Sequence, residues 1–336
     1  MQSDRNPIIS ISVGDFNGIG PEIILKSLSA IDLERSTPIL ISPLGVIEFY
    51  IELLNIDLNY RVLRNRNEIR SGVVNILPIY KTDINVTPGT LSPESGTVAM
   101  NAIETGVELC LNNRADALVT APISKESVNL AGYDIPGHTE FLASSTNTDS
   151  VLMTLISGDL RVALVTTHIP VKDVAKSLTP ALIREKARLL ANSLINDFGI
   201  NEPKIAVFGL NPHAGDGGVI GKEEIDMIIP TLNEIDQENE NYHVTGPFPA
   251  DGFFGQKLHE QYDGILAMYH DQGLAPFKLL SFGKGVNFTA GLPIIRTSPD
   301  HGTAFNIAGK GIANPSSFKE AYDLAVELSN KKLRED

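Results

Sequence analysis

The stretch IISISVGDFNGIGPEIILKSLS, residues 8–29, indicates the fold class of this chain. Its first part, Ile8–Val13, is a short, mostly apolar run rich in isoleucine, which is typical of a buried strand. A glycine-rich turn follows. Pro21 then stands near the first turn of a predicted helix, where its missing N–H costs nothing. The stretch therefore predicts a strand–turn–helix unit.

Short apolar runs alternate with longer amphipathic runs along the rest of the chain. This order predicts an α/β protein with a largely parallel sheet. The predicted strands are Ile8–Val13, Pro38–Ile41, Val74–Pro78, Ala117–Thr120, Val151–Ile156, Arg161–Thr166, Lys204–Gly209, Gly264–Met268 and Val286–Ala290. The predicted helices are Pro21–Ser29, Gly96–Asn112, Pro180–Phe198, Lys222–Glu234 and Ser317–Lys332.

Two proline- and glycine-rich segments, near Pro122–Gly137 and Phe277–Gly291, are candidate crossings between domains. Two crossings would make the first domain discontinuous, with both chain ends in it, and the second an insertion. We therefore expect a first domain of residues 1–125 plus 287–336 and a second of residues 126–286.

The composition restricts the class of protein. With 336 residues, 42% hydrophobic and 20% charged, the chain is not largely disordered. The net charge of -14 and the scattered Lys and Arg residues speak against nucleic-acid binding. No signal peptide or run of transmembrane length is visible, so we expect a cytoplasmic protein without a membrane partner. The single cysteine, Cys110, is expected to be a buried, inert thiol.

The segment Ala267–Gly311 concentrates His, Asp, Lys and Arg side chains among glycines. It has little helical character, so we interpret it as several loops at strand ends, where chemistry is usually found. Its last part, Asp300–Gly311, interleaves small and polar residues in a way that suits a flat ligand such as adenine.

Three histidines lie at or near the ends of predicted strands: His168, His213 and His270. Imidazoles placed at one sheet edge can converge on a catalytic divalent ion. Alternatively, each could cap a strand or pair with a carboxylate, but three in equivalent positions favour a metal. Two acidic residues, Asp251 and Asp271, are candidates for orienting the ligands, binding the metal or moving protons, with structural ion pairs as the alternative.

Positive charge near the glycines suggests an anionic ligand. Lys278, Lys284 and Arg296, with Asn287, could hold a phosphate or carboxylate, although surface ion pairs remain an alternative. His138 could bind substrate together with Thr139, or Thr139 could simply cap a helix. The turn at residues 14–20 could hold an anion or serve only as a tight turn.

Eight segments together give a resemblance that covers nearly the whole chain, from Gly14 to Gly311. They are GDFNGIGPE, VTAPISKE, GHTEFLA, RVALVTTHIPVKDVA, GLNPHAGDGGVIGKEEID, GPFPAD, AMYHDQGLAPFK and GVNFTAGLPIIRTSPDHGTAFNIAGKG. In this order they resemble the 4-hydroxythreonine-4-phosphate dehydrogenases of pyridoxal 5′-phosphate biosynthesis. The last segment is also similar to the adenine-binding loop of isocitrate and isopropylmalate dehydrogenases. The resemblance implies the fold of those enzymes, with two α/β/α domains and the active site in the cleft between them.

The resemblance also implies an oxidative decarboxylase that uses NAD (or NADP) and a divalent metal: Zn, Mg, Mn or Co. It implies oxidation of the 3-hydroxyl of 4-phosphooxy-L-threonine and loss of CO2 to give 3-amino-2-oxopropyl phosphate. It further implies a homodimer with a shared active site, in which the partner subunit donates one metal ligand. We expect that ligand to be His270.

The residues that match the family's sites fall into four groups. They are the metal ligands His168, His213 and His270; the substrate contacts His138, Thr139, Lys278, Asn287 and Arg296; the cofactor loop with Asp300, His301, Gly302, Thr303, Ala308 and Gly309; and the catalytic candidates Asp251, Asp271 and Lys278.

Three alternatives remain open. A related enzyme could oxidise 4-phospho-D-threonate or 4-phospho-D-erythronate with the same metal, cofactor and phosphate sites. A non-catalytic metal- or phosphate-binding sensor would be expected to lack a ligand or the cofactor loop, and both are present. A transacetylase-like enzyme on a related fold would need no metal.

Overall fold

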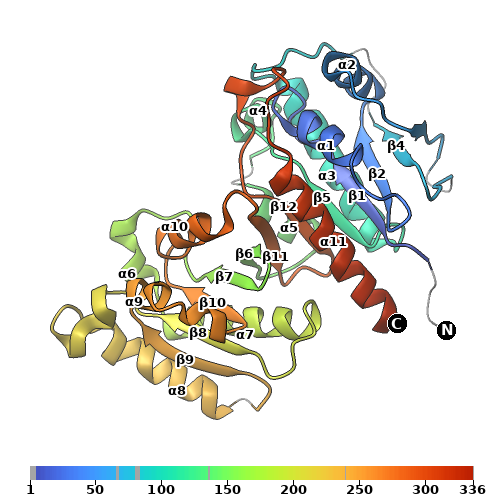
Figure 1. Cartoon of the computed structure of the whole chain (residues 1–336). Helices are drawn as coiled ribbons and strands as arrows, with labels where there is room; N and C mark the ends of the chain where they lie inside the picture. The colour runs from blue at the N-terminus through green and yellow to red at the C-terminus, as the bar shows by residue number, and fades with distance from the viewer. Residues whose placement is uncertain (1–4, 66–67, 80–83, 135–136, 239, 336) are drawn as a thin grey trace. The chain divides into compact units, whose positions relative to one another are not determined.

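The computed structural model describes residues 5–65, 68–79, 84–134, 137–238 and 240–335. The chain divides into two compact units. The first comprises residues 1–149 and 292–336, so it carries both chain ends, and the second comprises residues 150–291. Figure 1 labels most helices and strands of each unit.

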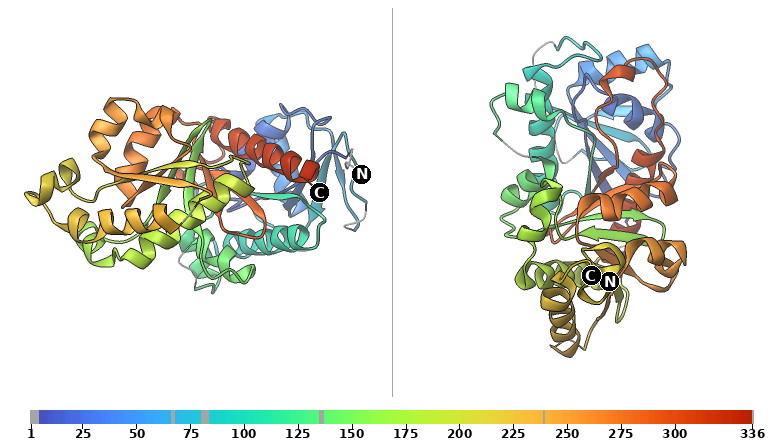
Figure 2. Two further views of the ribbon diagram at one scale, coloured as in Figure 1. Left: turned by 90° about the horizontal axis from the view of Figure 1, so that it is seen from below. Right: turned by 90° about the vertical axis from the view of Figure 1, so that its left-hand side faces the viewer.

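The first unit is built on a six-stranded parallel sheet in the order β3-β4-β2-β1-β5-β12. Helices α11 and α3 cover its opposite faces, as the left view of Figure 2 shows. Its strands are β1 (Ile8–Ser12), β2 (Thr37–Ser42), β3 (Tyr60–Val62), β4 (Val74–Pro78), β5 (Ala117–Thr120) and β12 (Ile295–Pro299). Its helices are α1 (Gly20–Leu28), α2 (Leu44–Leu54), α3 (Pro93–Leu111), α4 (Lys125–Leu130), α5 (His138–Ser145) and α11 (Ser316–Glu335).

The second unit has a mixed six-stranded sheet in the order β11-β6-β7-β10-β8-β9, in which β6 runs antiparallel to both neighbours. Helix α7 packs on one face and α10 on the other (Figure 2). The strands are β6 (Leu152–Ser157), β7 (Leu160–Leu164), β8 (Lys204–Phe208), β9 (His243–Phe248), β10 (Gly264–Ala267) and β11 (Val286–Ala290). The helices are α6 (Val174–Ser177), α7 (Pro180–Asn196), α8 (Ile229–Glu238), α9 (Ala250–Gly255) and α10 (His270–Ser281).

The α/β prediction is confirmed, and the opening stretch folds as strand β1, a turn and helix α1 with Pro21 in its first turn. Strand β1 is buried because it lies between β2 and β5 within the sheet, and α3 and α11 cover the two faces of that sheet. Among the described residues, no helix is long and apolar enough to span a bilayer.

The chain crosses between the units after residues 149 and 291. Both crossings lie later than the predicted boundaries at 125/126 and 286/287. Helix α5 packs on α3, which keeps residues 126–149 with the first unit. Strand β11 pairs with β6 over five residues, from Val286 opposite Ile156 to Ala290 opposite Leu152, which keeps it with the second unit. Strand pairing and helix packing determine the crossings, and the two glycine- and proline-rich segments precede them.

The interpretation of Ala267–Gly311 as loops is wrong over much of its length. Residues His270–Ser281 form α10 although Gly273 and Pro276 interrupt the helical pattern. A Cβ on Gly273 would lie 2.9 Å from atoms of Val162 and Leu164, so the glycine lets the helix approach β7 closely. Burial of Leu274 and Phe277 in the core outweighs the poor local propensity. Residues Ile295–Pro299 form β12, which pairs with β5.

Replacing Phe318 with alanine is expected to lower the free energy of unfolding by about 3–5 kcal/mol. This side chain of α11 is fully buried, and α11 packs against β12 and β5. The neighbouring Lys319→Ala serves as control, since its side chain is 46% exposed and its pair with Asp323 is worth about 0.5 kcal/mol or less. Denaturant titration checks both variants, and equal effects would contradict the packing argument.

Candidate metal and substrate site

Two of the three predicted metal ligands lie side by side. His168 follows β7, His270 begins α10 shortly after β10, and these strands are parallel neighbours. The pairing continues beyond the strands, because Thr166 donates from its backbone and from its hydroxyl to the carbonyl of Met268. The two imidazole rings lie with their centroids 5.9 Å apart and their planes tilted by 44°. This separation is short enough for one nitrogen of each ring to reach a common ion.

His270 also carries a carboxylate partner. Its Nδ1 lies 2.7 Å from Oδ1 of Asp271, whose side chain is 81% exposed. A carboxylate bound to one ring nitrogen fixes the ring orientation and leaves the other nitrogen for a metal. Of the roles predicted for Asp271, this contact supports orientation of a ligand.

The third predicted ligand, His213, lies apart from this pair in the second unit. It lines a hollow of about 500 Å³ together with Asp251, Tyr269 and Gln272. His168, His270 and Asp271 line another, of about 340 Å³, and Tyr269 belongs to both. Within the described part of one chain, no three His, Cys, Asp or Glu side chains are grouped as a metal site. The imidazole donors fit a divalent ion, but one chain supplies only a pair of them in contact.

The backbone at His213 has an uncommon conformation. Five consecutive residues, His213–Gly217, have φ between 45° and 81°, so the turn after β8 is left-handed. Each non-glycine residue in this region costs roughly 1–2 kcal/mol. Such strain persists where the surroundings impose it, and it is commonly found at functional sites.

A buried carboxylate holds the segment that precedes this turn. Glu224 is 1% exposed, and its Oε1 accepts the backbone N–H groups of Leu210 and Asn211, both at 2.8 Å. Its Oε2 accepts from the side chain of Asn211 at 2.9 Å. Glu224 begins a turn of π-helix, a feature often found near functional sites.

Gln272 ties the strand ends that carry the histidines. Its Oε1 accepts from the backbone of Met268 at 2.7 Å, and its Nε2 donates to the carbonyl of Gly209 at 2.6 Å. It therefore bridges the ends of β10 and β8. The roles of Glu224 and Gln272 could not be predicted from the sequence, because both depend on hydrogen bonds to backbone at the ends of separate strands.

Arg296 and His138, two predicted substrate contacts, lie in the first unit. Arg296 is 1% exposed, and burial lowers the pKa of its guanidinium to about 10. It donates to the hydroxyl of Thr120 at 2.7 and 3.2 Å. Nε2 of His138 is buried without a hydrogen-bond partner. The pKa of His138 lies well below its usual value, mainly because the ring is buried and also because Arg296 and Lys125 are positively charged. A buried cation and an unsatisfied imidazole favour an anionic, hydrogen-bonding ligand.

Lys125 is a basic residue of this region that the sequence prediction missed. A Cβ on Gly137 would lie 3.8 Å from its Nζ, so the lysine lies beside the start of α5. Thr139 is the second residue of α5, and the N-cap, Gly137, has no side-chain bond. The alternative role of Thr139 as a helix cap is therefore not observed.

Asn287 and Lys278, the other predicted substrate contacts, lie in the second unit. Oδ1 of Asn287, on β11, is buried and has no hydrogen-bond partner. Lys278 is exposed near the end of α10. Asp251, the second candidate for proton transfer, is exposed in the first turn of α9.

The predicted cofactor loop, Asp300–Gly311, follows β12. Nothing lies within 4 Å of a Cβ built on Gly302, and Nε2 of His301 is buried without a partner. An open backbone beside an unsatisfied ring nitrogen fits a flat heteroaromatic ligand. The turn at residues 14–20, by contrast, is buried throughout, and the backbone N–H of Asn17 donates to Oδ1 of Asp15 at 3.0 Å. This favours its interpretation as a structural turn.

Comparison with known proteins identifies the family. The family model described as pyridoxal phosphate biosynthetic protein PdxA matches residues 34–325. The chain belongs to the PdxA family. It is 43% identical over 329 residues to a 4-hydroxythreonine-4-phosphate dehydrogenase of Bacteroides thetaiotaomicron, which covers 97% of this chain and 90% of that relative.

Two further relatives bear on the fold and the substrate of this PdxA-family chain. The crystal structure of a 4-hydroxythreonine-4-phosphate dehydrogenase from Klebsiella pneumoniae has a TM-score of 0.88, with 36% identity, covering 96% of this chain and 100% of that one. A protein of Oceanobacillus iheyensis, named provisionally as a D-threonate 4-phosphate dehydrogenase, is 40% identical over 333 residues, covering 98% and 99% of the two chains.

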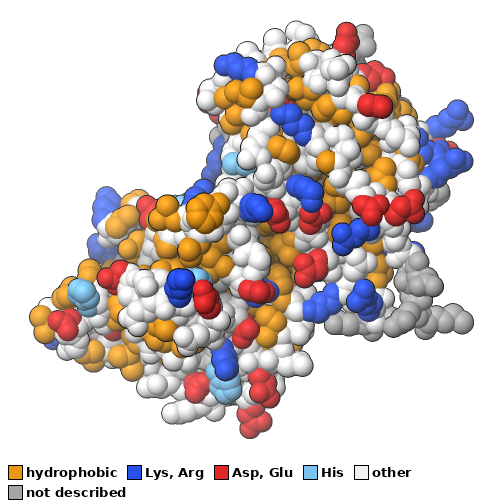
Figure 3. All heavy atoms as spheres, viewed as in Figure 1, with side chains coloured by type: hydrophobic (Ala, Val, Ile, Leu, Met, Phe, Trp, Pro, Cys, Tyr) orange, Lys and Arg blue, Asp and Glu red, His pale blue; other side chains and the backbone are white. Residues whose placement is uncertain are grey.

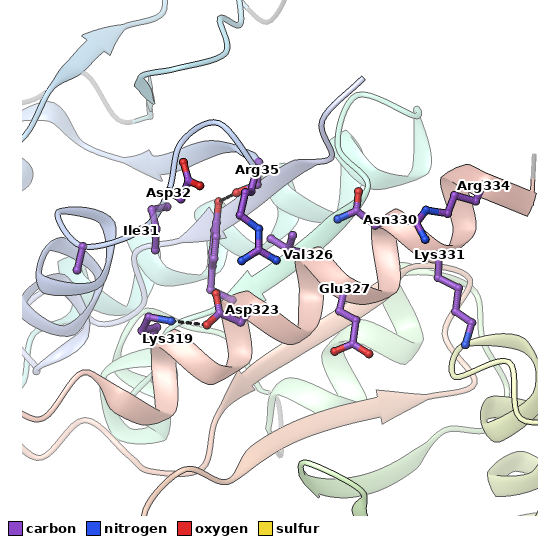
Figure 4. Close-up of a pocket in the computed structure, with 13 residues that line it drawn as sticks. Ile31, Asp32, Arg35, Lys319, Asp323, Val326, Glu327, Asn330, Lys331 and Arg334 are labelled. Carbon is purple, nitrogen blue, oxygen red and sulfur yellow. Dashed lines mark hydrogen bonds and ion pairs between the residues drawn. The ribbon is translucent and has the colours of Figure 1, made fainter. Parts of the chain in front are cut away.

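A larger hollow of the PdxA-family chain, about 980 Å³, lies elsewhere in the first unit, between α11 and residues 30–36. Figure 4 shows basic and acidic side chains interspersed along it, with Lys319 paired to Asp323. It contains no histidine, and its mixed charges do not favour one class of ligand. We therefore assign the chemistry to the residues described above.

Cys110 of the PdxA-family chain is expected to resist alkylation in the folded protein. Its side chain is buried, as predicted, and burial raises the pKa of the thiol to about 12. A raised pKa keeps the thiol protonated at all pH values well below that figure, and the thiolate is the reactive form. Labelling with iodoacetamide at mildly alkaline pH should modify only unfolded protein. Rapid labelling of the native protein would contradict the burial.

Proposed function

We propose that this chain is a 4-hydroxythreonine-4-phosphate dehydrogenase that uses NAD or NADP. It oxidises C3 of 4-phosphooxy-L-threonine by transferring a hydride to the cofactor, while the hydroxyl proton passes to a base. The β-keto acid then loses CO2, and the electron pair left on C2 takes up a proton to give 3-amino-2-oxopropyl phosphate. The geometry that supports this best is the ring pair of His168 and His270, with Asp271 behind His270.

His168, His213 and His270 would hold the divalent ion. Zinc suits three imidazoles, and Mg, Mn or Co would serve if oxygen ligands complete the shell. When bound, the ion supplies a Lewis acid at the substrate's C3 oxygen. Asp271 orients His270 through the 2.7 Å contact with its Nδ1. Asp251 and Asp271 are the candidates for accepting the hydroxyl proton and for returning one to C2.

The remaining assigned residues bind the substrate and the cofactor. Arg296 and Lys278 neutralise the phosphate through charge-assisted hydrogen bonds, and His138, Thr139 and Asn287 add neutral ones. The low pKa of His138 keeps its ring neutral near pH 7, so one nitrogen can accept a hydrogen bond. The loop with Asp300, His301, Gly302, Thr303, Ala308 and Gly309 receives the nicotinamide cofactor.

A homodimer would complete the metal site, because His213 lies apart from the His168–His270 pair within one chain. Large apolar side chains are exposed on the second unit, and Figure 3 shows such side chains gathered over α10. Leu279 and Phe282 are 75% and 87% exposed there. Exposed apolar residues in such numbers favour an association surface.

Mixing two inactive variants tests whether the active site is shared. The ring pair of one chain favours His213 as the ligand from the partner, whereas the family resemblance assigns that place to His270. In either arrangement, a dimer of one His213→Ala and one His270→Ala chain contains one intact site. Random reassociation should then restore about a quarter of the wild-type activity. If each site uses one chain only, every site in the mixture lacks a ligand and no activity returns. The latter result would contradict the shared site.

The substrate is tested by comparing kcat/KM for 4-phosphooxy-L-threonine and 4-phospho-D-threonate. The second is the alternative that the Oceanobacillus relative's name supports. We expect the first substrate to be preferred by on the order of a hundredfold, since a buried polar site discriminates strongly between an amino and a hydroxyl group. A preference of about a hundredfold for 4-phospho-D-threonate would overturn the assignment.

A further inference from the structure

Two residues of α1, Glu22 and Lys26, hold the end of the predicted cofactor loop. Nζ of Lys26 donates to the carbonyls of Gly311 and Ala313, both at 2.9 Å. Oε1 of Glu22 accepts the backbone N–H of Ala313 at 2.8 Å. These bonds join segments that are far apart in the sequence, and all the residues belong to the first unit.

The two side chains also form an ion pair. Nζ of Lys26 lies 2.7 Å from Oε1 of Glu22, whose side chain is fully buried, while the lysine side chain is 26% exposed. A buried carboxylate needs a partner, because an uncompensated buried charge is strongly destabilising. Charge-assisted bonds to backbone groups are also stronger than neutral ones. The pair is therefore well suited to fixing the backbone at residues 311–313.

The start of the same loop is fixed by neighbouring residues. The N–H of Ile19 donates to the carbonyl of Thr303 at 2.9 Å, and the N–H of Asp300 donates to the hydroxyl of Ser317 at 2.9 Å. A Cβ on Gly18 would lie 2.9 Å from the carbonyl oxygen of Thr303, so the backbones are packed closely. Both ends of the loop are thus held, and α1 or the turn before it contributes at each end.

The backbone between these ends adopts conformations that need support. Ala304 has a φ of 43°, and Gly309 and Gly311 have φ of 73° and 71°. Ala304 in particular is a non-glycine residue in the left-handed region, which is held only where neighbouring contacts impose it. Release of one anchor would let the loop leave the conformation in which its open backbone can meet a flat ligand.

We propose that Glu22 and Lys26 are positioning residues for the dinucleotide. They do not lie in the loop itself, but they fix its end and thereby set the affinity for NAD. This inference rests on the proposed function, because it takes Asp300–Gly311 to be the NAD loop. It adds two residues that sequence comparison with the loop alone would not select.

The test is the KM for NAD of Lys26→Met and Lys26→Arg. Lys26→Met should raise the KM for NAD by on the order of tenfold to a hundredfold, because displacement of a binding segment is costly. The kcat and the KM for the phosphorylated substrate should change by about twofold or less. Lys26→Arg retains the charge and its donors and should recover most of the NAD affinity. Lys319→Met, an exposed lysine of α11, is the control that should match wild type.

A double variant separates positioning from folding. Lys26→Met leaves the Glu22 charge uncompensated, so it should lower the melting temperature. Glu22→Gln with Lys26→Met removes that charge, and it should recover the melting temperature but not the KM for NAD. Full recovery of NAD affinity in the double variant, or an unchanged KM for NAD in Lys26→Met, would overturn the positioning role.

Fluorescence titration of the wild type with NADH is done first. Absence of binding would refute the NAD assignment itself. Binding of NADH with equal affinity by wild type and Lys26→Met would refute only the positioning role.

Discussion

Replacing His213 with alanine is expected to lower kcat/KM by on the order of 10³-fold or more. His213 is the proposed third imidazole for the divalent ion, and a strained left-handed turn braced by Glu224 fixes its position. Steady-state kinetics at saturating metal measures the effect. The melting temperature of the apoprotein should change little, since the side chain lines an open hollow.

His243→Ala is the matched control for this variant. Its ring is exposed and pairs with Asp236, and it has no proposed role in the site. It should retain full activity. Normal turnover by His213→Ala, or an equal loss in His243→Ala, would contradict the assignment of His213 as a ligand.

Replacing Arg296 with methionine is expected to lower kcat/KM by on the order of 10²–10³-fold, mainly through a higher KM. The guanidinium is buried, and burial lowers its pKa to about 10, so its charge is held in the protein interior at a cost. Binding a dianionic phosphate would compensate that cost. Methionine removes the charge, so the apoprotein should unfold at a temperature close to that of wild type.

Arg296→Lys separates charge from geometry. Lysine keeps the charge but loses the planar arrangement of donors, so it should recover only part of the affinity. Inhibition by inorganic phosphate gives a second measure, and it should weaken in both variants. An unchanged KM in Arg296→Met would contradict the role of this residue in substrate binding.

The sequence predicted the fold class because many buried parallel strands, such as β10, are continuous apolar runs. It missed α10 because Gly273 and Pro276 disrupt the local pattern. Packing of α10 against Val162 and Leu164 stabilises the helix, and the local sequence contains no indication of this contact. Strand β12 was also missed, because it is defined by its pairing with β5, which lies far away in the sequence.

The candidate site was predictable where residues follow strands. His168 and His270 were chosen because each stands at or just after the end of an apolar run, and the structure brings their rings to 5.9 Å. Glu224, Gln272 and Lys125 were not assigned roles. Their contacts depend on the tertiary packing of separate strand ends and loops, which cannot be deduced from a single sequence.

The most direct test of the central claim is the formation of NADH by the purified protein with 4-phosphooxy-L-threonine, NAD and a divalent ion. We predict that NADH appears, that CO2 is released in equal amount, and that a chelator stops both. Absence of NADH with folded protein under these conditions, or turnover unaffected by the chelator, would contradict the proposed metal-dependent oxidation.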